Sequence, residues 1–143
     1  MVSIDIICVG RLKEKYWVDA VAEYSKRLSR FCKLSIIELT EDQDMLAKLP
    51  TGSDNYIIAL DIQGKKLDSE QLAEKMADVQ LAGKSRIAFL IGGSTGLSEA
   101  EKSAAHMRLS FSAMTFPHQM FRVMLLEQIY RAFKINNNET YHK

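Results

Sequence analysis

The sequence predicts an α/β fold: a three-layer domain with a mainly parallel sheet. Short strand-like segments alternate with amphipathic helical segments, which is the pattern of repeated βα units. Residues 86–91 are apolar throughout, as expected for a strand that is buried on both faces of a parallel sheet. The chain has 143 residues, of which 47% are hydrophobic and 26% charged, so we expect a single folded domain over residues 1–143.

Four elements are expected in the first third of the chain. Residues 2–9 are rich in β-branched side chains and stop at Gly10, which predicts a buried strand. Residues 16–31 carry apolar side chains every three or four positions, so they predict an amphipathic helix. Residues 34–39 are expected to form a second strand, and residues 41–49 a polar link or a short helix.

A third strand and a second helix follow. Residues 56–62 (YIIALDI) are largely apolar and are closed by Gly64, which predicts a strand. Asp68 or Ser69 is suited to cap the N-terminus of a helix, because each side-chain oxygen accepts hydrogen bonds from free backbone N–H groups. This helix is expected to run to about Leu81.

The remaining elements surround a glycine-rich loop. The strand predicted for residues 86–91 leads into this loop, and Ser98 and Glu101 then have the spacing of a reciprocal capping box, so a helix should begin there. Residues 109–115 are the candidate for a fifth strand. Pro117 suits the first turn of a last helix that extends to about Lys134.

The last predicted helix is apolar around nearly its whole circumference. One face of a sheet covers only one side of a helix, so we expect a second subunit to cover the rest, most simply in a homodimer. The alternative is that another helix of the same chain covers it. The apolar positions are Met120, Phe121, Val123, Met124, Leu125, Leu126, Ile129, Tyr130, Ala132 and Phe133.

Several function classes are excluded by what the sequence lacks. The three histidines form no HExxH motif, and the two cysteines, Cys8 and Cys32, have no CxxC spacing, so no metal site is expected. There is no GxSxG motif for a serine nucleophile. No segment is long and apolar enough to span a bilayer, and the start lacks the pattern of a signal peptide, so we expect a cytoplasmic protein with no membrane partner.

Three loops at the expected carboxyl ends of strands are the candidates for a binding site, because ligands of parallel sheets gather there. They cover residues 60–65, 91–97 and 110–118. The glycine loop is not a dinucleotide fingerprint, because Ile91 stands where GxGxxG needs a glycine. Its glycines fit either a tight turn between strand and helix or close main-chain contact with a flat ligand.

The polar residues near the last loop, the last helix and the tail lack any recognised catalytic motif. Glu127 and Arg131 are four residues apart on one helix face and form either a simple ion pair or part of a site. Such a set suits a reaction in which a cofactor supplies the electrophile and the protein supplies positioning, of which methyl transfer from S-adenosylmethionine is one. The other members of the set are His118, Arg122, Gln128, Tyr141 and His142.

Five segments together resemble the RlmH family of SPOUT-class methyltransferases, which methylate N3 of a pseudouridine in 23S ribosomal RNA. The resemblance extends over essentially the full chain. The segments are IICVGRLKEKYW (6–17), IALDIQGK (58–65), FLIGGSTGLS (89–98), LSFSAMTFPHQMFRVMLLEQIYRAFKI (109–135) and YHK (141–143).

The resemblance implies a C-terminal trefoil knot of the SPOUT or α/β-knot type, an obligate homodimer built on the last helix, and S-adenosyl-L-methionine as cofactor. It further implies that the substrate is 23S ribosomal RNA within the assembled ribosome, because the family lacks a separate RNA-binding domain. The cofactor contacts would be Leu60, Gly92, Gly93, Phe111, Ser112, Ala113, Met114, Thr115 and Phe116.

Four residues are the catalytic candidates, because they lie beside the expected cofactor loop or on the tail that is similar to the family's. The N3 proton has to leave, so a nearby base, or a cation that stabilises the anionic ring, would help. The candidates are His118, Arg122, Tyr141 and His142.

Alternatives remain open for the substrate surface and for the activity. Basic residues in the first helical region either contact ribosomal phosphates or form an ordinary solvated face. A noncatalytic, nucleotide-sensing ribosome assembly factor on the same scaffold is the second functional hypothesis, and a nicotinamide-dependent reductase the third. The basic residues are Arg11, Lys13, Lys15, Arg27 and Arg30.

Overall fold

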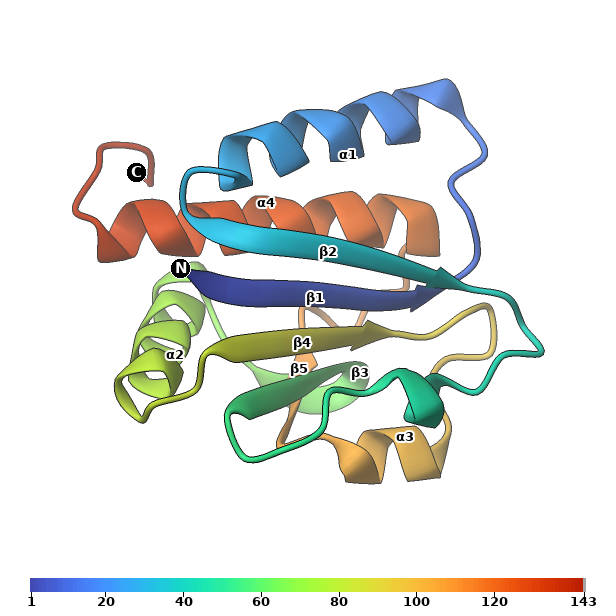
Figure 1. Ribbon diagram of the computed structural model, residues 1–143. Coiled ribbons are helices and arrows are strands. Elements are labelled where there is room, and N and C mark those ends of the chain that lie inside the picture. Colours follow the sequence, from blue (N-terminus) through green and yellow to red (C-terminus); the bar gives the residue numbers. More distant parts are fainter. Residues whose placement is uncertain (143) are drawn as a thin grey trace.

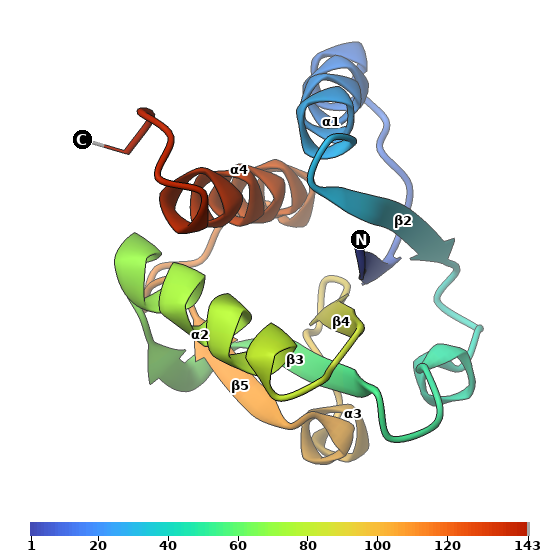
Figure 2. The same ribbon diagram turned by 60° about the vertical axis from the view of Figure 1, so that its left-hand side comes forward.

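A computed structural model describes residues 1–142 and contains the three layers that the sequence predicts. Five parallel strands form one sheet in the order β2-β1-β4-β3-β5. Helices α1, α4 and α2 cover one face, while α3 and a short 3-10 helix, Met45–Lys48, cover the other (Figures 1 and 2). The α/β fold class is therefore confirmed, whereas Lys143 lies outside the described residues.

The central strands are apolar on both sides because both of their faces are covered. Strand β1, Val2–Val9, pairs with β2, Cys32–Leu39, and with β4, Arg86–Ile91. Ile6 points into the core under α1, α4 and α2, whereas its neighbour Ile7 packs in the core on the opposite face. The bounds of β1 and β4 agree with the sequence-based prediction.

Strand β5 is shorter than predicted and begins earlier. It covers Met107–Ser110, so the strand expected for residues 109–115 is wrong beyond Ser110. The chain turns there because the Ser110 hydroxyl donates to the Ser112 carbonyl oxygen at 3.2 Å, and the Met114 N–H donates to the Ser112 hydroxyl at 3.0 Å. Residues 111–117 are consequently free to form a loop beside the strand ends.

Strand β3, Asn55–Lys66, is longer than predicted and contains an irregularity. Leu60 and Lys65 both lie opposite Leu109 of β5, so the residues between them bulge out of the ladder. Gly64 permits this bulge, because a Cβ atom there would lie 2.7 Å from the backbone carbonyl carbon of Arg108.

The predicted helix starts are confirmed. Helix α2, Ser69–Leu81, begins with a capping box between Asp68 and Gln71, and α3, Glu99–Ala104, begins with one between Ser98 and Glu101. Helix α1 covers Lys15–Leu28 and ends three residues before the predicted boundary, where the Ser29 hydroxyl donates to the Lys26 carbonyl oxygen at 2.7 Å.

Helix α4, His118–Asn136, lies between α1 and α2 on the sheet (Figures 1 and 2). Leu125, Leu126 and Ile129 are fully buried against the sheet and the flanking helices. Neighbouring helices of the same chain therefore explain part of the apolar circumference of α4, as the alternative interpretation expects. Half-buried apolar residues such as Met120 and Val123 remain for a second subunit, and the homodimer stays a prediction.

The trefoil knot also stays a prediction. Among residues 1–142, no helix combines the length and apolar character that crossing a membrane requires.

Candidate functional site

Three predicted segments meet in one cavity of about 150 Å³, at the carboxyl ends of β4 and β5 and at the bulge within β3. The loop within β3, the glycine loop after β4 and the loop after β5 each contribute to its wall. Eight of the nine residues implied as cofactor contacts line this cavity, and Ala113 is exposed in the same turn without lining it. The eight are Leu60, Gly92, Gly93, Phe111, Ser112, Met114, Thr115 and Phe116.

The glycine loop is a tight turn whose main chain forms one side of the cavity. The Gly96 N–H donates to the Gly93 carbonyl oxygen at 3.0 Å, and Gly96 has a φ of +77°. A Cβ atom on Gly92 would lie 2.4 Å from the carbonyl carbon of Gly96. The turn therefore requires glycine for its own packing, and this packing also brings main-chain polar groups to the cavity.

The opposite side of the cavity is aromatic and apolar. The rings of Phe111 and Phe121 lie 4.8 Å apart between centroids, and that of Phe116 lies 6.5 Å from Phe121. Such a wall suits the flat face of a heteroaromatic ring.

Asp61 also lines the cavity, and sequence reasoning did not select it. Its side chain is only 7% exposed, and its carboxylate oxygens lie 3.6 Å from the Lys102 ammonium and 3.9 Å from the Arg108 guanidinium. The position of Asp61 directly after Leu60, in a loop at a strand end, is the signal that could have identified it. The cavity thus combines an apolar wall with a buried carboxylate.

His118 lies at the edge of this cavity, on the first residue of α4. Its Nε2 atom is close to the Gly10 main chain, because a Cβ atom on Gly10 would lie 3.9 Å from it. The next residue, Gln119, accepts a hydrogen bond from the Lys13 N–H at 2.9 Å, so the loop after β1 is tied to the start of α4. The structure therefore places one catalytic candidate at the mouth of the cavity.

Arg122 lies one turn further along α4 and is buried rather than directed into the cavity. Only 1% of the residue is exposed. Its guanidinium forms an ion pair with the Glu38 carboxylate at 2.6 Å and donates to the Gly10 carbonyl oxygen at 3.1 Å. Burial raises the pKa of the neighbouring Cys8 thiol to about 11, which leaves this thiol protonated and unreactive at neutral pH. Arg122 thus holds α4 against the ends of β1 and β2.

The C-terminal tail folds back onto the middle of α4. The Tyr141 hydroxyl donates to Glu127 Oε1 at 2.8 Å, and the Arg131 guanidinium donates to both carboxylate oxygens of Glu127 at 3.1 and 3.2 Å. Burial, followed by the hydrogen bond to Glu127, raises the pKa of Tyr141 to about 12. Tyr141 is therefore a protonated hydrogen-bond donor at neutral pH.

His142 joins the same network. Its Nδ1 atom lies 3.1 Å from an Arg131 guanidinium nitrogen, and its Nε2 atom lies 3.5 Å from the Glu70 carboxylate. The four catalytic candidates thus form two groups within one chain, with His118 and Arg122 at the start of α4 and Tyr141 and His142 beside Glu127. The ion-pair interpretation of Glu127 and Arg131 is confirmed, and this pair also anchors the tail.

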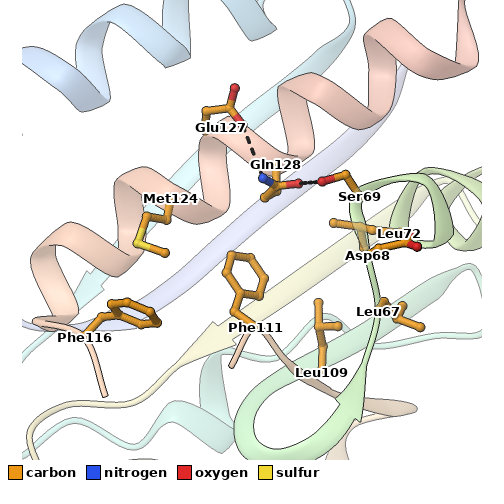
Figure 3. A pocket seen from close by; sticks show the side chains of 10 residues that line it. All are labelled: Leu67, Asp68, Ser69, Leu72, Leu109, Phe111, Phe116, Met124, Glu127 and Gln128. Carbon is orange, nitrogen blue, oxygen red and sulfur yellow. Dashed lines mark hydrogen bonds between the residues drawn. The ribbon is translucent and has the colours of Figure 1, made fainter. Parts of the chain in front are cut away.

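A second cavity, of about 420 Å³, lies between the start of α2 and the outer side of α4 (Figure 3). Leu109, Phe111 and Phe116 line both cavities. The Ser69 hydroxyl donates to Gln128 Oε1 at 2.6 Å across this second cavity's edge. Among the described residues, no group of three or more His, Cys, Asp or Glu side chains could hold a metal ion.

Comparison with known proteins places the chain in a family. The family model described as "Predicted SPOUT methyltransferase" matches residues 2–142. The protein called "Ribosomal RNA large subunit methyltransferase H" from Clostridium novyi (strain NT) is 52% identical, and the alignment covers 99% of each chain. The protein of the same name from Clostridium botulinum (strain Alaska E43 / Type E3) is 50% identical with the same coverage.

Solved structures share the fold at low sequence identity. A probable methylase family protein from Haemophilus influenzae Rd KW20 superposes with a TM-score of 0.61 at 16% identity, over 99% of this chain and 71% of that one. The SpoU methyltransferase AviRb from Streptomyces viridochromogenes, solved in complex with the cofactor AdoMet, gives a TM-score of 0.56 at 12% identity, over 96% of this chain and 59% of that one. From the family match and the full-length relatives together, the chain belongs to the SPOUT methyltransferase family.

Proposed function

We propose that the protein transfers a methyl group from S-adenosyl-L-methionine to N3 of a pseudouridine in 23S ribosomal RNA, within the assembled ribosome. The observation that carries this proposal is the meeting of three separately predicted loops in one cavity at the strand ends. The relatives' name, which specifies a large-subunit ribosomal RNA methyltransferase, supports the class of substrate.

The cavity's chemistry fits this cofactor. The aromatic wall of Phe111, Phe116 and Phe121 suits an adenine ring, and the main chain of the glycine loop can meet the ring's polar edge. The Asp61 carboxylate adds a polar group to this wall, and its charge is balanced by Lys102 and Arg108. When bound, the cofactor supplies an electrophilic methyl group on a sulfonium sulfur.

The protein's own residues then have to orient the acceptor and take up a proton. The transfer breaks the carbon–sulfur bond and the N3–H bond and forms the N3–carbon bond, so one proton leaves for each turnover. His118 is our candidate acceptor for this proton, because it lines the cavity and a ring nitrogen of an imidazole can accept a proton.

The other three candidates have different roles in this proposal. Arg122 is a positioning residue, because its guanidinium is used by Glu38 and Gly10 and it lines neither cavity. Tyr141 acts as a hydrogen-bond donor, because its raised pKa of about 12 excludes a phenolate base at neutral pH. His142, held beside Arg131, places a second polar ring on the same tail.

A homodimer and direct contact with the ribosome are also proposed. The half-buried apolar side chains of α4 that line neither cavity, such as Met120 and Val123, would be covered by a second copy of the chain. Of the five basic residues considered for phosphate contact, Lys15, Arg27 and Arg30 form ion pairs within the chain. Arg11 and Lys13 form none with the residues that the structure describes, which favours these two.

Modification mapping tests the proposed function. Purified protein is incubated with S-adenosylmethionine and ribosomes from cells that lack the gene, and the ribosomal RNA is digested and analysed by mass spectrometry. We expect one new methyl group on a pseudouridine. A noncatalytic assembly factor would leave the methyl inventory unchanged, and calorimetry that detects no uptake of S-adenosylmethionine by folded protein would refute the proposal.

A further inference from the structure

We propose that the second cavity, shown in Figure 3, receives the pyrimidine base of the acceptor nucleotide, and that Gln128 reads the edge of its ring. This inference rests on the proposed function, because it concerns the acceptor of the same methyl transfer. It assigns a site and a specificity residue to a cavity that shares only Leu109, Phe111 and Phe116 with the proposed cofactor cavity.

The two cavities are neighbours. Displacement at a methyl carbon requires the acceptor nitrogen to approach within about 3–3.5 Å, so the acceptor has to occupy a space that borders the cofactor. Leu109, Phe111 and Phe116 contribute to both cavities, so the second cavity borders the first along a shared wall.

The lining of the second cavity matches the surface chemistry of a nucleobase. Phe111, Phe116 and Met124 offer flat or adaptable apolar surface, and Figure 3 shows these three side chains on one side of the space. Ser69 and Gln128 lie at another side and are polar. An extruded base has apolar faces and a polar edge, so its faces match the apolar side of the cavity and its edge matches the polar side. The volume of about 420 Å³ lies within the range of ligand pockets, roughly 300–1,000 Å³.

The orientation of the Gln128 amide also supports a base in this cavity. Its Oε1 atom accepts the hydrogen bond from the Ser69 hydroxyl, so its Nε2 end is turned toward Glu127, at a long distance of 3.4 Å from Oε2 (Figure 3). An amide nitrogen has two hydrogens, so at least one remains for a ligand. A donor at this position fits a carbonyl oxygen of a uracil-type ring and opposes the amino group of cytosine.

Glu127 cannot take over this role. Both of its carboxylate oxygens already accept hydrogen bonds from Arg131, and Oε1 also accepts one from Tyr141. Gln128 is therefore the member of this adjacent pair that has hydrogen-bonding capacity to spare. Glu127 connects the wall of the cavity to the tail.

Replacing the amide by an apolar group of similar size tests the assignment. We expect Gln128→Leu to lower kcat/KM for ribosomes about tenfold to a hundredfold, because a base carbonyl would lose its partner. The Kd for S-adenosylmethionine, measured by calorimetry, should stay within about twofold. Gln80→Leu is the matched control, because Gln80 lies on α2 and bonds only to the Met76 carbonyl oxygen, so its kcat/KM should equal that of the wild type.

A binding measurement on the wild-type protein provides an independent readout. The methyl carbon of Met124 is labelled, and its NMR signal is followed during titration with pseudouridine 5′-monophosphate and with cytidine 5′-monophosphate. We expect the signal to shift with the first nucleotide and to stay in place with the second. Equal shifts with both nucleotides, or a shift with neither, would overturn the assignment, and this holds even if Gln128→Leu does not fold.

Different experimental outcomes would overturn the proposed function and the proposed base pocket. Wild-type protein that binds S-adenosylmethionine but methylates no ribosome would overturn the proposed function. Wild-type protein that methylates ribosomes, together with folded Gln128→Leu of unchanged kcat/KM, would overturn only the base pocket. Ser69→Ala adds a graded case, because releasing the amide from its orientation should lower kcat/KM less than removing it.

Discussion

Arg122, near the start of α4, and Glu127 and Arg131, near its middle, are held by contrasting contacts. At the first end, Arg122 is 1% exposed and binds Glu38 and the Gly10 carbonyl oxygen, which fixes the helix to the strand ends. At the other end, the Glu127 and Arg131 side chains are 19% and 24% exposed, and they form a partly exposed network with the tail. Water reaches the Arg131 guanidinium but not that of Arg122, whose side chain is 2% exposed, so the first connection is the costlier one to break.

This difference separates a fixed part of the site from an adjustable one. The cofactor cavity and His118 lie at the buried end, where rigid geometry favours binding and orientation. The tail residues Tyr141 and His142 lie at the partly exposed end, where their polar groups remain accessible to a large substrate. Five experiments test this contrast.

Removing the tail should have the largest effect on activity. We expect deletion of residues 140–143 to abolish methylation of ribosomes while the Kd for S-adenosylmethionine changes by no more than a few-fold, because the cofactor cavity contains no tail residue. Methylation assays and calorimetry measure the two effects. Thr140→Ala, at an exposed position, serves as the control and should remain active. Full turnover of the truncated protein would remove the tail from the catalytic machinery.

Distorting the glycine loop should weaken cofactor binding without a direct effect on the tail. In Gly92→Ala, the new Cβ atom would lie 2.4 Å from the Gly96 carbonyl carbon, so the turn has to shift. We expect the Kd for S-adenosylmethionine to rise at least about tenfold, since a strained turn costs roughly 1–3 kcal/mol. Ser94→Ala, at an exposed position of the same loop, should bind normally. Equal affinity of the two variants would contradict the proposed role of the loop.

Breaking the buried ion pair should lower stability more than breaking an exposed one. We expect Arg122→Met to reduce the free energy of unfolding by about 1–2 kcal/mol, because the Gly10 carbonyl oxygen and the Glu38 carboxylate, whose side chain is 36% exposed, lose a donor whose side chain is 2% exposed. Denaturant unfolding measures this change. Arg27→Met breaks an exposed pair with Glu23 on α1 and should cost much less. Similar losses in both variants would show that the buried end is not held by Arg122.

The tail contact should appear as a pH dependence of stability. At pH 7, Tyr141→Phe removes the hydrogen bond to Glu127 and should lower the free energy of unfolding by about 1 kcal/mol.

The raised pKa of Tyr141 determines the direction of this pH dependence. In the folded protein the pKa is about 12, compared with an ordinary value of 10.0, so the stabilisation is complete below pH 10 and is lost as the pH rises through 12. Unfolding curves between pH 9 and 12 should therefore converge for wild type and Tyr141→Phe. A constant difference across this range would mean that the phenol titrates normally.

The smallest effect is expected in the salt dependence of ribosome binding. Arg11→Ala and Lys13→Ala should each reduce the slope of log K against log salt concentration by about 1, because each removes one phosphate contact. Arg30, near the tail, is already paired with Glu139, so Arg30→Ala should leave the slope unchanged. Ribosome binding is measured between about 50 and 200 mM salt, a range that spans the physiological concentration. The slopes show whether Arg11 and Lys13, and not Arg30, contact phosphates.

Local features of the fold could be predicted from the sequence because short-range interactions determine them. The capping boxes at Asp68 and Ser98 need only residues three positions away, and both are present. The apolar continuity of β4 also follows from its position between two covered faces. The end of β5 could not be predicted, because Phe111 continues its apolar run while the turn depends on serine side-chain hydrogen bonds.

The site was predictable as a set of loops but not as a set of contacts. The three strand-end loops meet as expected, since parallel topology brings their ends together. The burial of Arg122 depends on Glu38, which is 84 residues away in the chain. The tail's return to Glu127 and the cavity beside Gln128 likewise depend on tertiary packing, for which the sequence carries no local signal.

The inner position of β1 in an all-parallel sheet has a consequence for biosynthesis. Its inner partner β4 begins at Arg86, so the first strand made must wait for more than half of the chain before that edge is paired. Sheets of such distant pairings fold slowly, and exposed strand edges invite association with other chains. The nascent protein should accordingly depend on chaperone protection until β4 emerges, and arrest of translation before residue 86 should yield a protease-sensitive chain.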